Sequence, residues 1–498
     1  MDRGQLLGLL AAVGLAAAVA STPLAGLSPA GQHALAAMAF AGTLWVTGAL
    51  PLPVTALLVP VALVGLDVVE TLPAAFSGFA DPVIFLMLAG FVLARALQKH
   101  GVDRRVAYWV LARLGSSPSR LVLAVMVTTA GLSMLVSNTA TTAMMAPIAL
   151  GVAGGVAPTE KATDANIGVA MLLGTAYAAS LGGLGTLVGS PPNAIVAAQL
   201  EATIGYRVGF LGWMRVGLPI AVVSVPLTWL VLTRWLYPPQ IADVSVARGK
   251  AATALEEAGS LDAAAKRVVL VAGATAALWV LGGLDFALAE VLPPAWFTTL
   301  FGGPGPTVLG TTGHLGLLHF SVVGLLAIPA LVLSGGLEWE DAERIDWGTL
   351  VLLGGGLSLA NGLAGTDATR WLADRTLALL GDAPVVLVVL GLLVLVVVVG
   401  ELASNTAMAA IVAPLLITVG PRYATALGTT DAGASVFLAI AGGVAASVGF
   451  ALPVATPPNA IVFGTGELTK DQMLRAGVVL DALMVLVMTG LLFVVVPR

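Results

Sequence analysis

A polar motif that occurs twice inside long apolar stretches constrains this chain more than any other feature. Ser137–Ala140, with the sequence Ser-Asn-Thr-Ala, returns as Ser404–Ala407, and a proline follows ten residues after each serine. A second motif, Pro191–Val196, returns as Pro457–Val462. The displacement is 267 positions for the first motif and 266 for the second. The chain is therefore predicted to fold as two related halves that arose by duplication.

The apolar stretches around these motifs predict a protein class. Of the 498 residues, 58% are hydrophobic and only 10% are charged, with a mean hydropathy of +1.00. Apolar runs of about 20 residues, separated by short polar loops, are typical of a polytopic helical membrane protein. The absence of cysteine excludes a disulfide framework and thiolate metal sites, and no basic patch indicates a nucleic-acid partner.

Eleven segments are apolar and long enough to be predicted as transmembrane helices, with ends accurate to a few residues. They are residues 4–20, 33–49, 52–68, 82–98, 166–190, 208–236, 266–284, 316–334, 348–364, 432–454 and 474–496.

Two further apolar stretches carry the Ser-Asn-Thr motifs near their centres. Residues 121–159 contain no charged residue, and residues 383–421 contain only Glu401. Each stretch forms either two full spans or one re-entrant hairpin, and both options return the chain to the side from which it came. Five spans then remain in each half, and because five is odd, the second half enters the membrane from the opposite face. Inverted-topology repeats of this kind are common in secondary transporters.

These segments define the predicted organisation and orientation. An N-terminal span (1–32) precedes a first repeat (33–236), a cytoplasmic surface loop or helix (237–265) and a second repeat (266–498). Most Lys and Arg residues fall on the side of the N-terminus, which predicts a cytoplasmic N-terminus and an extracytoplasmic C-terminus. Within the repeats, the hairpins are expected at about 118–156 and 383–421, and helices broken by the Pro-Pro-Asn motifs at about 166–200 and 432–466.

The motifs combine groups that suit a small anion and a cation. Serine and threonine cap helix N-termini, where the helix dipole favours negative charge. Hydroxyl and amide groups donate to carboxylates, whereas backbone carbonyls and the amide oxygen of Asn suit Na⁺. Each proline pair interrupts a helix and frees nearby carbonyls, and Ser190 and Thr456 directly precede the pairs. No Lys or Arg stands beside the motifs, so a bound anion would need helix dipoles and a co-bound cation, which couples the two.

Other residues leave alternatives open. Glu401 is an intramembrane acid, which indicates a proton carrier or gate or a structural hydrogen bond between hairpin and scaffold. Asp81 and Asp346 are expected to cap helices, and Gly354–Gly356 to allow close helix packing.

An enzyme would need a nucleophile with its base, or metal ligands, and the chain shows no such set. A channel would not need two inverted half-sites.

The doubled Ser-Asn-Thr and Pro-Pro-Asn motifs closely resemble those of the divalent anion:sodium symporter family, over nearly the whole chain. The resemblance implies an all-α membrane protein with about 11 transmembrane helices plus two re-entrant helical hairpins in an inverted-topology repeat. It further implies a homodimer whose scaffold holds a transport domain that moves by an elevator-type mechanism.

The resemblance also implies roles for individual residues. One end of the anion would be bound by Ser137, Asn138 and Thr139 and the other by Ser404, Asn405 and Thr406, with Ser190, Thr456 and Pro457 nearby. One sodium site would involve Ser133, Ser137, Asn138 and Gly189, and the other Gly400, Ala403, Asn405 and Ala455. The chain departs from the pattern at Gly400, where relatives that carry dicarboxylates commonly have a threonine.

The expected function is sodium-coupled uptake of four-carbon dicarboxylates such as succinate, malate or fumarate across the cell membrane. Sulfate or citrate symport and sodium-independent dicarboxylate exchange remain alternatives. No enzyme activity and no cofactor are expected, and Na⁺ is the expected coupling ion.

Overall fold

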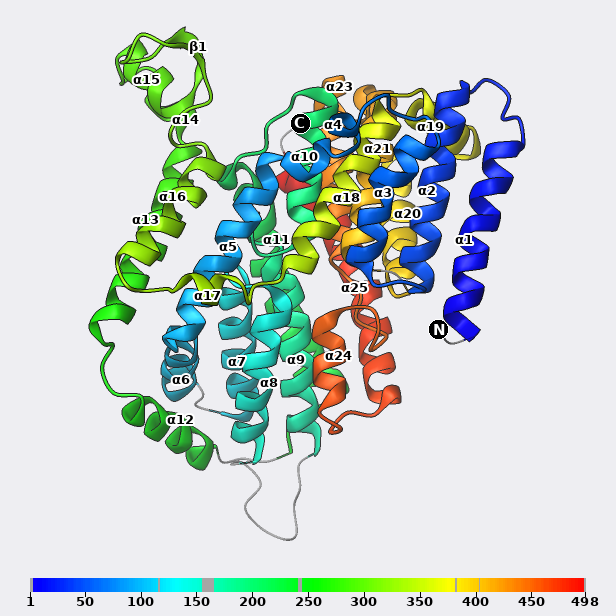
Figure 1. Ribbon diagram of the computed structural model, residues 1–498. Helices are drawn as coiled ribbons and strands as arrows, with labels where there is room; N and C mark the ends of the chain where they lie inside the picture. The colour runs from blue at the N-terminus through cyan, green and yellow to red at the C-terminus, as the bar shows by residue number, and fades with distance from the viewer. Residues whose placement is uncertain are drawn as a thin grey trace.

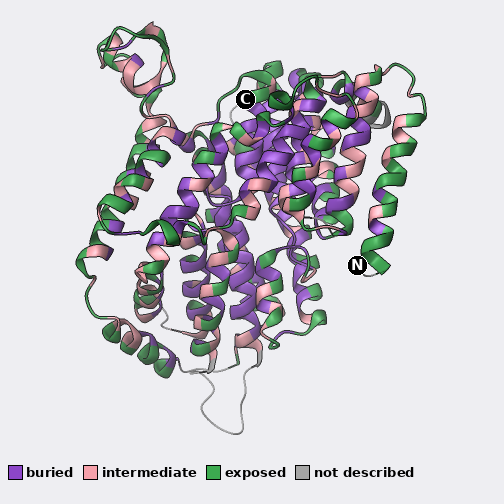
Figure 2. Cartoon of the chain, in the orientation of Figure 1, coloured by how far each residue is buried: buried purple, intermediate pink, exposed green. Residues whose placement is uncertain are grey.

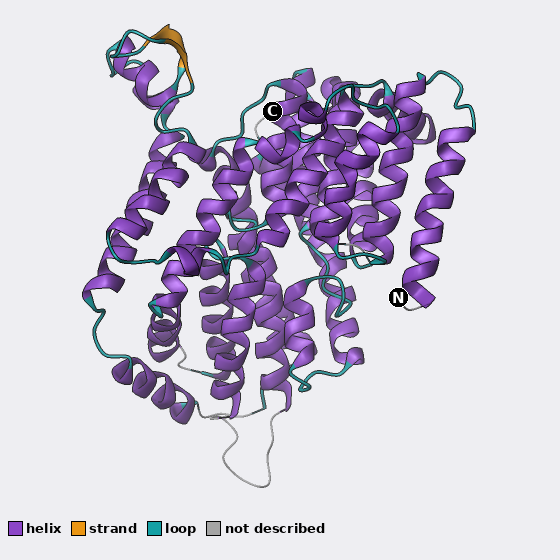
Figure 3. Cartoon of the chain, in the orientation of Figure 1, coloured by secondary structure: helices purple, strands orange, loops and turns teal. Residues whose placement is uncertain are grey.

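The computed structural model describes residues 3–114, 117–154, 165–240, 244–380, 383–402 and 404–496, and these are almost entirely helical (Figure 1). Within the described residues, Figure 3 shows strands only in a small projection formed by residues 285–318. There β1 (Gly303–Pro306) pairs antiparallel with β2 (Thr312–His314). The projection has no counterpart among the segments expected from the sequence.

The first part of the chain forms helices whose ends follow local rules. Ser28 and Asp81 cap α2 and α5 by accepting hydrogen bonds from Gly31 and Val83, and a proline opens each helix. Gly48, at φ 61°, closes α2 in the left-handed conformation. The elements are α1 (Arg3–Ser21), α2 (Pro29–Thr47), α3 (Leu52–Gly65), α4 (Leu72–Ala75), the 3₁₀ turn η1 (Ser77–Ala80), α5 (Pro82–Lys99) and α6 (Val102–Leu114).

Each Ser-Asn-Thr motif lies at the turn between two antiparallel helices, and an interrupted helix follows each pair. In the first half, the pair is α7 (Pro118–Ser133) and α8 (Asn138–Gly154), and the interrupted helix is α9 (Ala165–Gly183) with α10 (Pro191–Ile204). In the second half, the pair is α20 (Val385–Gly400) and α21 (Asn405–Val419), and the interrupted helix is α23 (Asp431–Ala446) with α24 (Pro457–Gly464).

The remaining elements connect and surround these two units. They are α11 (Phe210–Leu230) with a π-helical end η2 (Val231–Leu236), α12 (Ser245–Glu257), α13 (Ala263–Gly282), α14 (Asp285–Leu288), α15 (Pro294–Phe301), α16 (Phe320–Leu333), α17 (Trp339–Ala342), α18 (Trp347–Ala364), α19 (Ala368–Leu380), η3 (Gly420–Tyr423), α22 (Ala424–Leu427) and α25 (Lys470–Val495). Prolines inside α3, α8, α11, α16 and α21 are accommodated without ending the helix.

The two halves exchange their interrupted helices. In Figure 1, α7, α8 and α9 lie in the lower part of the molecule, and α21 and α23 lie in the upper part. After its break, the first interrupted helix continues upward as α10, which packs against α21 and α23. After its own break, the second continues downward as α24, which packs against α8 and α9. Each break therefore lies where the two halves meet.

Burial separates the centre of the molecule from its periphery (Figure 2). Nearly all of α9 and most of α10 and α23 are buried, whereas α1 and α13 expose apolar side chains such as Leu7 and Leu270. Close backbone approach supports the centre: a Cβ atom on Gly355 would lie 2.5 Å from the carbonyl oxygen of Ala56 in α3. The glycine run Gly354–Gly356 thus permits close helix packing, as expected.

Each of the eleven segments expected from hydropathy contains a helix, but the expected segments 166–190 and 432–454 run past α9 and α23 into the two breaks. Among the described residues, seven helical segments have the length and composition of membrane spans; they are Arg3–Ser21, Pro82–Lys99, Phe210–Leu236, Ala263–Gly282, Trp347–Ala364, Asn405–Leu427 and Lys470–Val495. Five shorter apolar helices, α3, α7, α16, α20 and α23, accompany them. The chain is thus a helical membrane protein, and α12 forms within the expected surface segment 237–265.

Candidate functional site

One cavity collects both pairs of repeated motifs. Its volume is about 650 Å³, within the range of small-molecule sites. Every residue expected to contact the anion lines it, namely Ser137, Asn138, Thr139, Ser190, Ser404, Asn405, Thr406, Thr456 and Pro457. The two Ser-Asn-Thr motifs, 267 positions apart in the sequence, thus line the same cavity. A duplicated sequence alone does not require its two copies to lie together.

The first half of the site is built around the side chain of Asn138. Ser133, one turn before the tip, donates to the carbonyl oxygen of Ala179 at 2.8 Å and lies 2.6 Å from the Asn138 amide. When the amide nitrogen faces inward, it donates to the oxygens of Ala179 and Gly189 at 3.0 and 3.1 Å. When the amide oxygen faces inward, it joins three other oxygens in one small space. An all-oxygen set suits a hard cation such as Na⁺.

Two glycines leave room for this amide. A Cβ atom on Gly183 would lie 2.3 Å from Asn138 Oδ1, and one on Gly189 would lie 2.5 Å from the Gly183 carbonyl oxygen. A side chain at Gly183 would displace the Asn138 amide, and one at Gly189 would push against the backbone of Gly183 and Ser133. Of the residues expected at the first sodium site, Ser133, Asn138 and Gly189 therefore lie together, and the structure adds the carbonyl of Ala179.

Hydroxyl groups at the four helix N-termini differ in how they are used. Ser137 caps α8 by accepting from the Ala140 N–H at 3.3 Å, and Thr456 caps α24 by accepting from the Asn459 N–H at 3.2 Å. Ser190 and Ser404 occupy the cap positions of α10 and α21 without a capping hydrogen bond. These two hydroxyls, one from each half, remain available to a ligand in the cavity.

The second half of the site lacks the side chains that surround Asn138. Gly400 stands where the first half has Ser133, and a Cβ atom there would lie 3.8 Å from the carbonyl oxygen of Val448. The Oδ1 atom of Asn405 is buried, and it has no hydrogen-bond partner in the described part of the chain. Ala455 is buried and lines the cavity, and Ala403 lies outside the described residues.

Both interrupted helices are held open by the same hydrogen bonds. Asn193 donates from Nδ2 to the carbonyls of Gly183 and Thr186 at 2.8 and 2.7 Å. Asn459 donates to the carbonyls of Gly449 and Leu452, both at 3.0 Å. Each asparagine thus satisfies carbonyls that the break releases, which membrane burial demands. The repeated Pro-Pro-Asn sequence contained this signal, although the sequence analysis assigned no role to the asparagine.

Glu401 ties the second tip to the break beside it. Its two oxygens accept from the N–H groups of Ala451 and Leu452 at 3.0 and 2.8 Å. Asp481 of α25 accepts from the Phe450 N–H at 3.1 Å, so α25 is tied to the same break. Sequence reasoning missed Asp481, which is one acid in a long apolar helix.

The charge in the cavity comes mainly from helix ends. Among the described residues, no Lys or Arg lines it, and its one carboxylate is that of Asp346. Asp346 caps α18 by accepting from the Thr349 N–H and hydroxyl at 3.0 and 2.6 Å, as the sequence predicted. Ser137, Ser190, Ser404 and Thr456 mark the N-termini of α8, α10, α21 and α24, whose dipoles favour an anion.

Comparison with known proteins agrees with this arrangement. Residues 4–495 match the family model described as the sodium:sulfate symporter transmembrane region. An uncharacterized transporter of Haemophilus influenzae is 36% identical over 92% of this chain and 90% of its own length. The sodium-dependent dicarboxylate transporter SdcS of Staphylococcus aureus is 30% identical over 94% of this chain and 86% of its own length.

Solved structures support the fold. The Alcanivorax borkumensis YdaH transporter aligns with a TM-score of 0.55 at 17% identity, covering 99% of this chain and 98% of that one. Neisseria gonorrhoeae MtrF aligns with a TM-score of 0.56 at 14% identity, covering 85% of this chain and 82% of that one. At these identities the likeness concerns the architecture alone.

Proposed function

Because this chain belongs to the divalent anion:sodium symporter family, we propose that it takes up four-carbon dicarboxylates together with sodium. The observation that carries the proposal is the single cavity lined by both Ser-Asn-Thr motifs and both helix breaks. Ser137 to Thr139 would bind one carboxylate and Ser404 to Thr406 the other. The unused hydroxyls of Ser190 and Ser404 would donate to these oxygens.

The dicarboxylate is favoured over other divalent anions by the relatives and by the cavity. The Staphylococcus aureus relative is a sodium-dependent dicarboxylate transporter. Two separate sets of donors in one cavity, one from each half, suit an anion with charge at both ends, whereas sulfate presents its charge at one centre. Citrate would place a third carboxylate in a cavity without a lysine or arginine among the described residues that line it, which is costly.

Sodium would complete the first half of the site. The Ser133 hydroxyl and the carbonyls of Ala179 and Gly189 all lie within hydrogen-bonding distance of the Asn138 amide. A cation bound there would lie beside Ser137 and offset the charge of the substrate, so each would raise the affinity of the other. In the second half, Gly400, Ala403, Asn405 and Ala455 would form a weaker site.

The finer architecture follows from the exchange of α10 and α24 between the halves. We propose eleven transmembrane helices and two re-entrant hairpins, with the second half inserted in the opposite sense. Three arms, α7, α8 and α20, contain 16, 17 and 16 residues, whereas α21 runs on through η3 and α22 to Leu427. At about 1.5 Å per residue, these three arms reach about 24–26 Å, less than the hydrocarbon thickness of about 30 Å.

The same proposal places the N-terminus in the cytoplasm and the C-terminus outside. It also includes a homodimer whose transport domain, formed by the hairpins and interrupted helices, moves through the scaffold by an elevator-type mechanism. The central burial of α9, α10 and α23 supports a compact moving unit.

The test is uptake of radiolabelled succinate into proteoliposomes that contain the purified protein. We expect uptake with an inward sodium gradient, and its collapse when choline replaces sodium. Excess unlabelled malate or fumarate should compete, whereas excess sulfate or citrate should compete weakly. Competition by sulfate alone would overturn the assigned substrate class.

Sodium-independent exchange is the second candidate, and Gly400 favours it, because this position offers no hydroxyl for a second sodium ion. Exchange would appear as succinate uptake that persists in choline and accelerates when the vesicles contain dicarboxylate. Empty liposomes provide the background for both experiments.

A further inference from the structure

The cavity lined by both Ser-Asn-Thr motifs is called the substrate cavity below. A second, smaller cavity adjoins it and supplies the positive charge that the substrate cavity lacks. Its volume is about 320 Å³. It shares Phe91, Ser137, Thr139 and Asp346 with the substrate cavity, so the two meet at the first Ser-Asn-Thr tip. Its own lining includes Arg95, Gln98 and Arg344, and we call it the arginine vestibule.

Helix α5 sets the order of these side chains. Phe91, Arg95 and Gln98 are spaced at i, i+4 and i+7, so they share one face of the helix. Phe91 reaches the substrate cavity and Arg95 the vestibule. A ligand that leaves the substrate cavity past Thr139 therefore meets the Arg95 guanidinium within about one helical turn.

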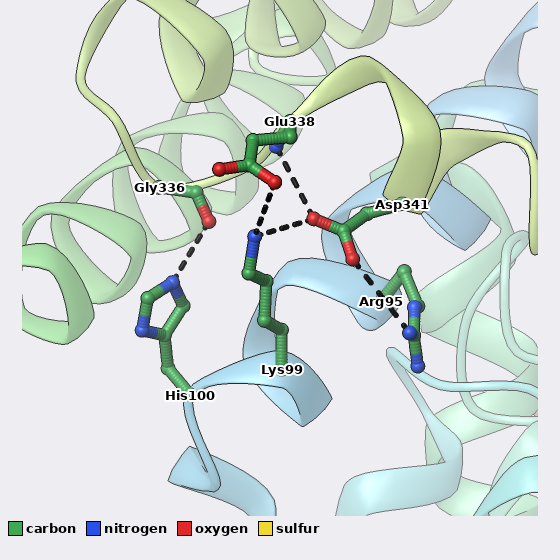
Figure 4. Close-up of polar contacts among 6 residues, drawn as sticks. All are labelled: Arg95, Lys99, His100, Gly336, Glu338 and Asp341. Carbon is green, nitrogen blue, oxygen red and sulfur yellow. Dashed lines mark hydrogen bonds and ion pairs between the residues drawn. The ribbon is translucent and has the colours of Figure 1, made fainter.

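Arg95 keeps part of its donor capacity. Its Nη2 atom lies 3.7 Å from Asp341 Oδ1, beyond hydrogen-bonding distance, and its buried Nε has no partner within the described residues. Asp341 is held instead by Lys99, at 2.5 Å, and Lys99 also faces Glu338 at 3.7 Å (Figure 4). The hydrogen bond from Lys99 holds the pKa of the Asp341 carboxyl below its ordinary value. Lys99 thus neutralises Asp341 and leaves Arg95 loosely paired.

Arg344 adds a second guanidinium to the vestibule. It is exposed, and it forms no ion pair with the part of the chain that the structure describes. The acid in the vestibule lining, Asp346, directs both oxygens to Thr349 at the N-terminus of α18, where the helix dipole also offsets its charge. The vestibule therefore presents two guanidinium groups and one carboxylate whose oxygens already accept hydrogen bonds from Thr349.

We propose that Arg95 and Arg344 form an anion-capture site that binds one carboxylate of a dicarboxylate as it passes between bulk water and the substrate cavity. Guanidinium groups bind carboxylates through paired hydrogen bonds, and a positive entrance raises the rate of anion association. The substrate cavity can then bind the anion without a Lys or Arg of its own. A fixed positive side chain in that cavity would slow release of the anion. This inference rests on the proposed function for the identity of the ligand.

A cysteine probe tests the vestibule without relying on transport. The chain contains no cysteine, so Gln98→Cys introduces a single thiol, and Ala94→Cys gives a second probe position in the same cavity. The rates of modification by an anionic and a cationic methanethiosulfonate reagent are compared. For each cysteine variant, we divide the modification rate of the anionic reagent by that of the cationic reagent. We expect this ratio to be at least about fivefold higher than in the same cysteine variant that also carries Arg95→Gln and Arg344→Gln. Arg104→Gln, an exposed arginine of α6 outside both cavities, is the matched control.

Uptake kinetics provide the second readout. In proteoliposomes, Arg95→Gln with Arg344→Gln should raise the KM for succinate presented on the cytoplasmic side, where α5 ends under the proposed topology, about threefold to tenfold. The kcat should change less than twofold, and the effect should shrink at high salt. An equal labelling ratio with and without the arginines would overturn the anion-capture site while leaving the proposed function intact. A charge-selective ratio in a protein that does not transport dicarboxylates would retain the capture site and reject the proposed substrate.

Discussion

The two halves of the site share a backbone plan but differ in what surrounds the tip asparagine. Asn138 lies among Ser133 and the carbonyls of Ala179 and Gly189. Gly400 stands in place of that serine in the second half, and the Asn405 oxygen lacks a partner in the described structure. Duplication therefore preserved the geometry that brings four helix N-termini together, while one half kept the oxygen cluster that suits a cation.

The two halves also anchor their tips differently. At the position of Met134 in the first tip, the second tip has Glu401. In the first half, the Thr186 hydroxyl bonds the Met134 carbonyl. In the second, the Glu401 carboxylate accepts from the Leu452 N–H at the equivalent point of the break. The two breaks are thus anchored to their tips by different chemistry, which makes the halves separable by mutation.

The largest difference should come from the tip asparagines. Asn138→Ala removes a group that bonds three buried oxygens, each worth about 1–3 kcal/mol when left unpaired. Sodium-driven succinate uptake should fall at least about 100-fold, with a smaller loss in Asn405→Ala. Size-exclusion profiles should match wild type. Near-normal uptake by Asn138→Ala would show that the first half does not bind the ions or the anion as proposed.

The shared asparagines of the two breaks should behave alike. Asn193→Leu and Asn459→Leu each remove two hydrogen bonds to backbone carbonyls, so each should lower the free energy of unfolding by about 2 kcal/mol. Thermal unfolding in detergent measures both. Equal losses would establish that the breaks are structurally equivalent. A loss confined to one variant would mean that only that break depends on its asparagine.

Much of this comparison could be predicted from the sequence, because the motif spacing and apolar runs encode it. The repeats identified the four segments that meet, and the helices begin where prolines and capping residues stand, as at Pro118 and Asp346. Contacts between distant residues were not encoded locally. Asp481 is separated from Glu401 by 80 positions, and only packing of α25 against the second break brings the two together.

The capping differences also escaped prediction. Both tips read Ser-Asn-Thr, yet Ser137 caps its helix and Ser404 does not. The serine side chain rotates about its Cα–Cβ bond, so the partner of its hydroxyl depends on the local backbone geometry. Identical residues at the two tips do not determine that geometry. The same holds for the projection at residues 285–318, whose Gly- and Pro-rich sequence specifies turns without indicating which strands pair.

Exchanging the residues one turn before each tip should move sodium affinity between the halves. Ser133→Gly removes a hydroxyl from the oxygen cluster and should raise the sodium concentration for half-maximal uptake about tenfold, equivalent to about 1.4 kcal/mol. Gly400→Thr has room for its Cβ near Val448 and should lower that concentration several-fold. Ser133→Thr keeps the hydroxyl and serves as the control. An unchanged sodium dependence in Gly400→Thr would mean that this position does not face an ion.

The smallest expected effect separates the two tip serines in the absence of substrate. Ser137→Ala loses a capping hydrogen bond to the Ala140 N–H and should cost about 1 kcal/mol of stability. Ser404→Ala loses no cap and should leave the unfolding temperature within error of wild type. Succinate should then stabilise wild type more than either variant, because both hydroxyls line the cavity. If Ser404→Ala responded to succinate as wild type does, the Ser404 hydroxyl would not contact the anion, and substrate recognition would rest on the remaining donors of the second tip.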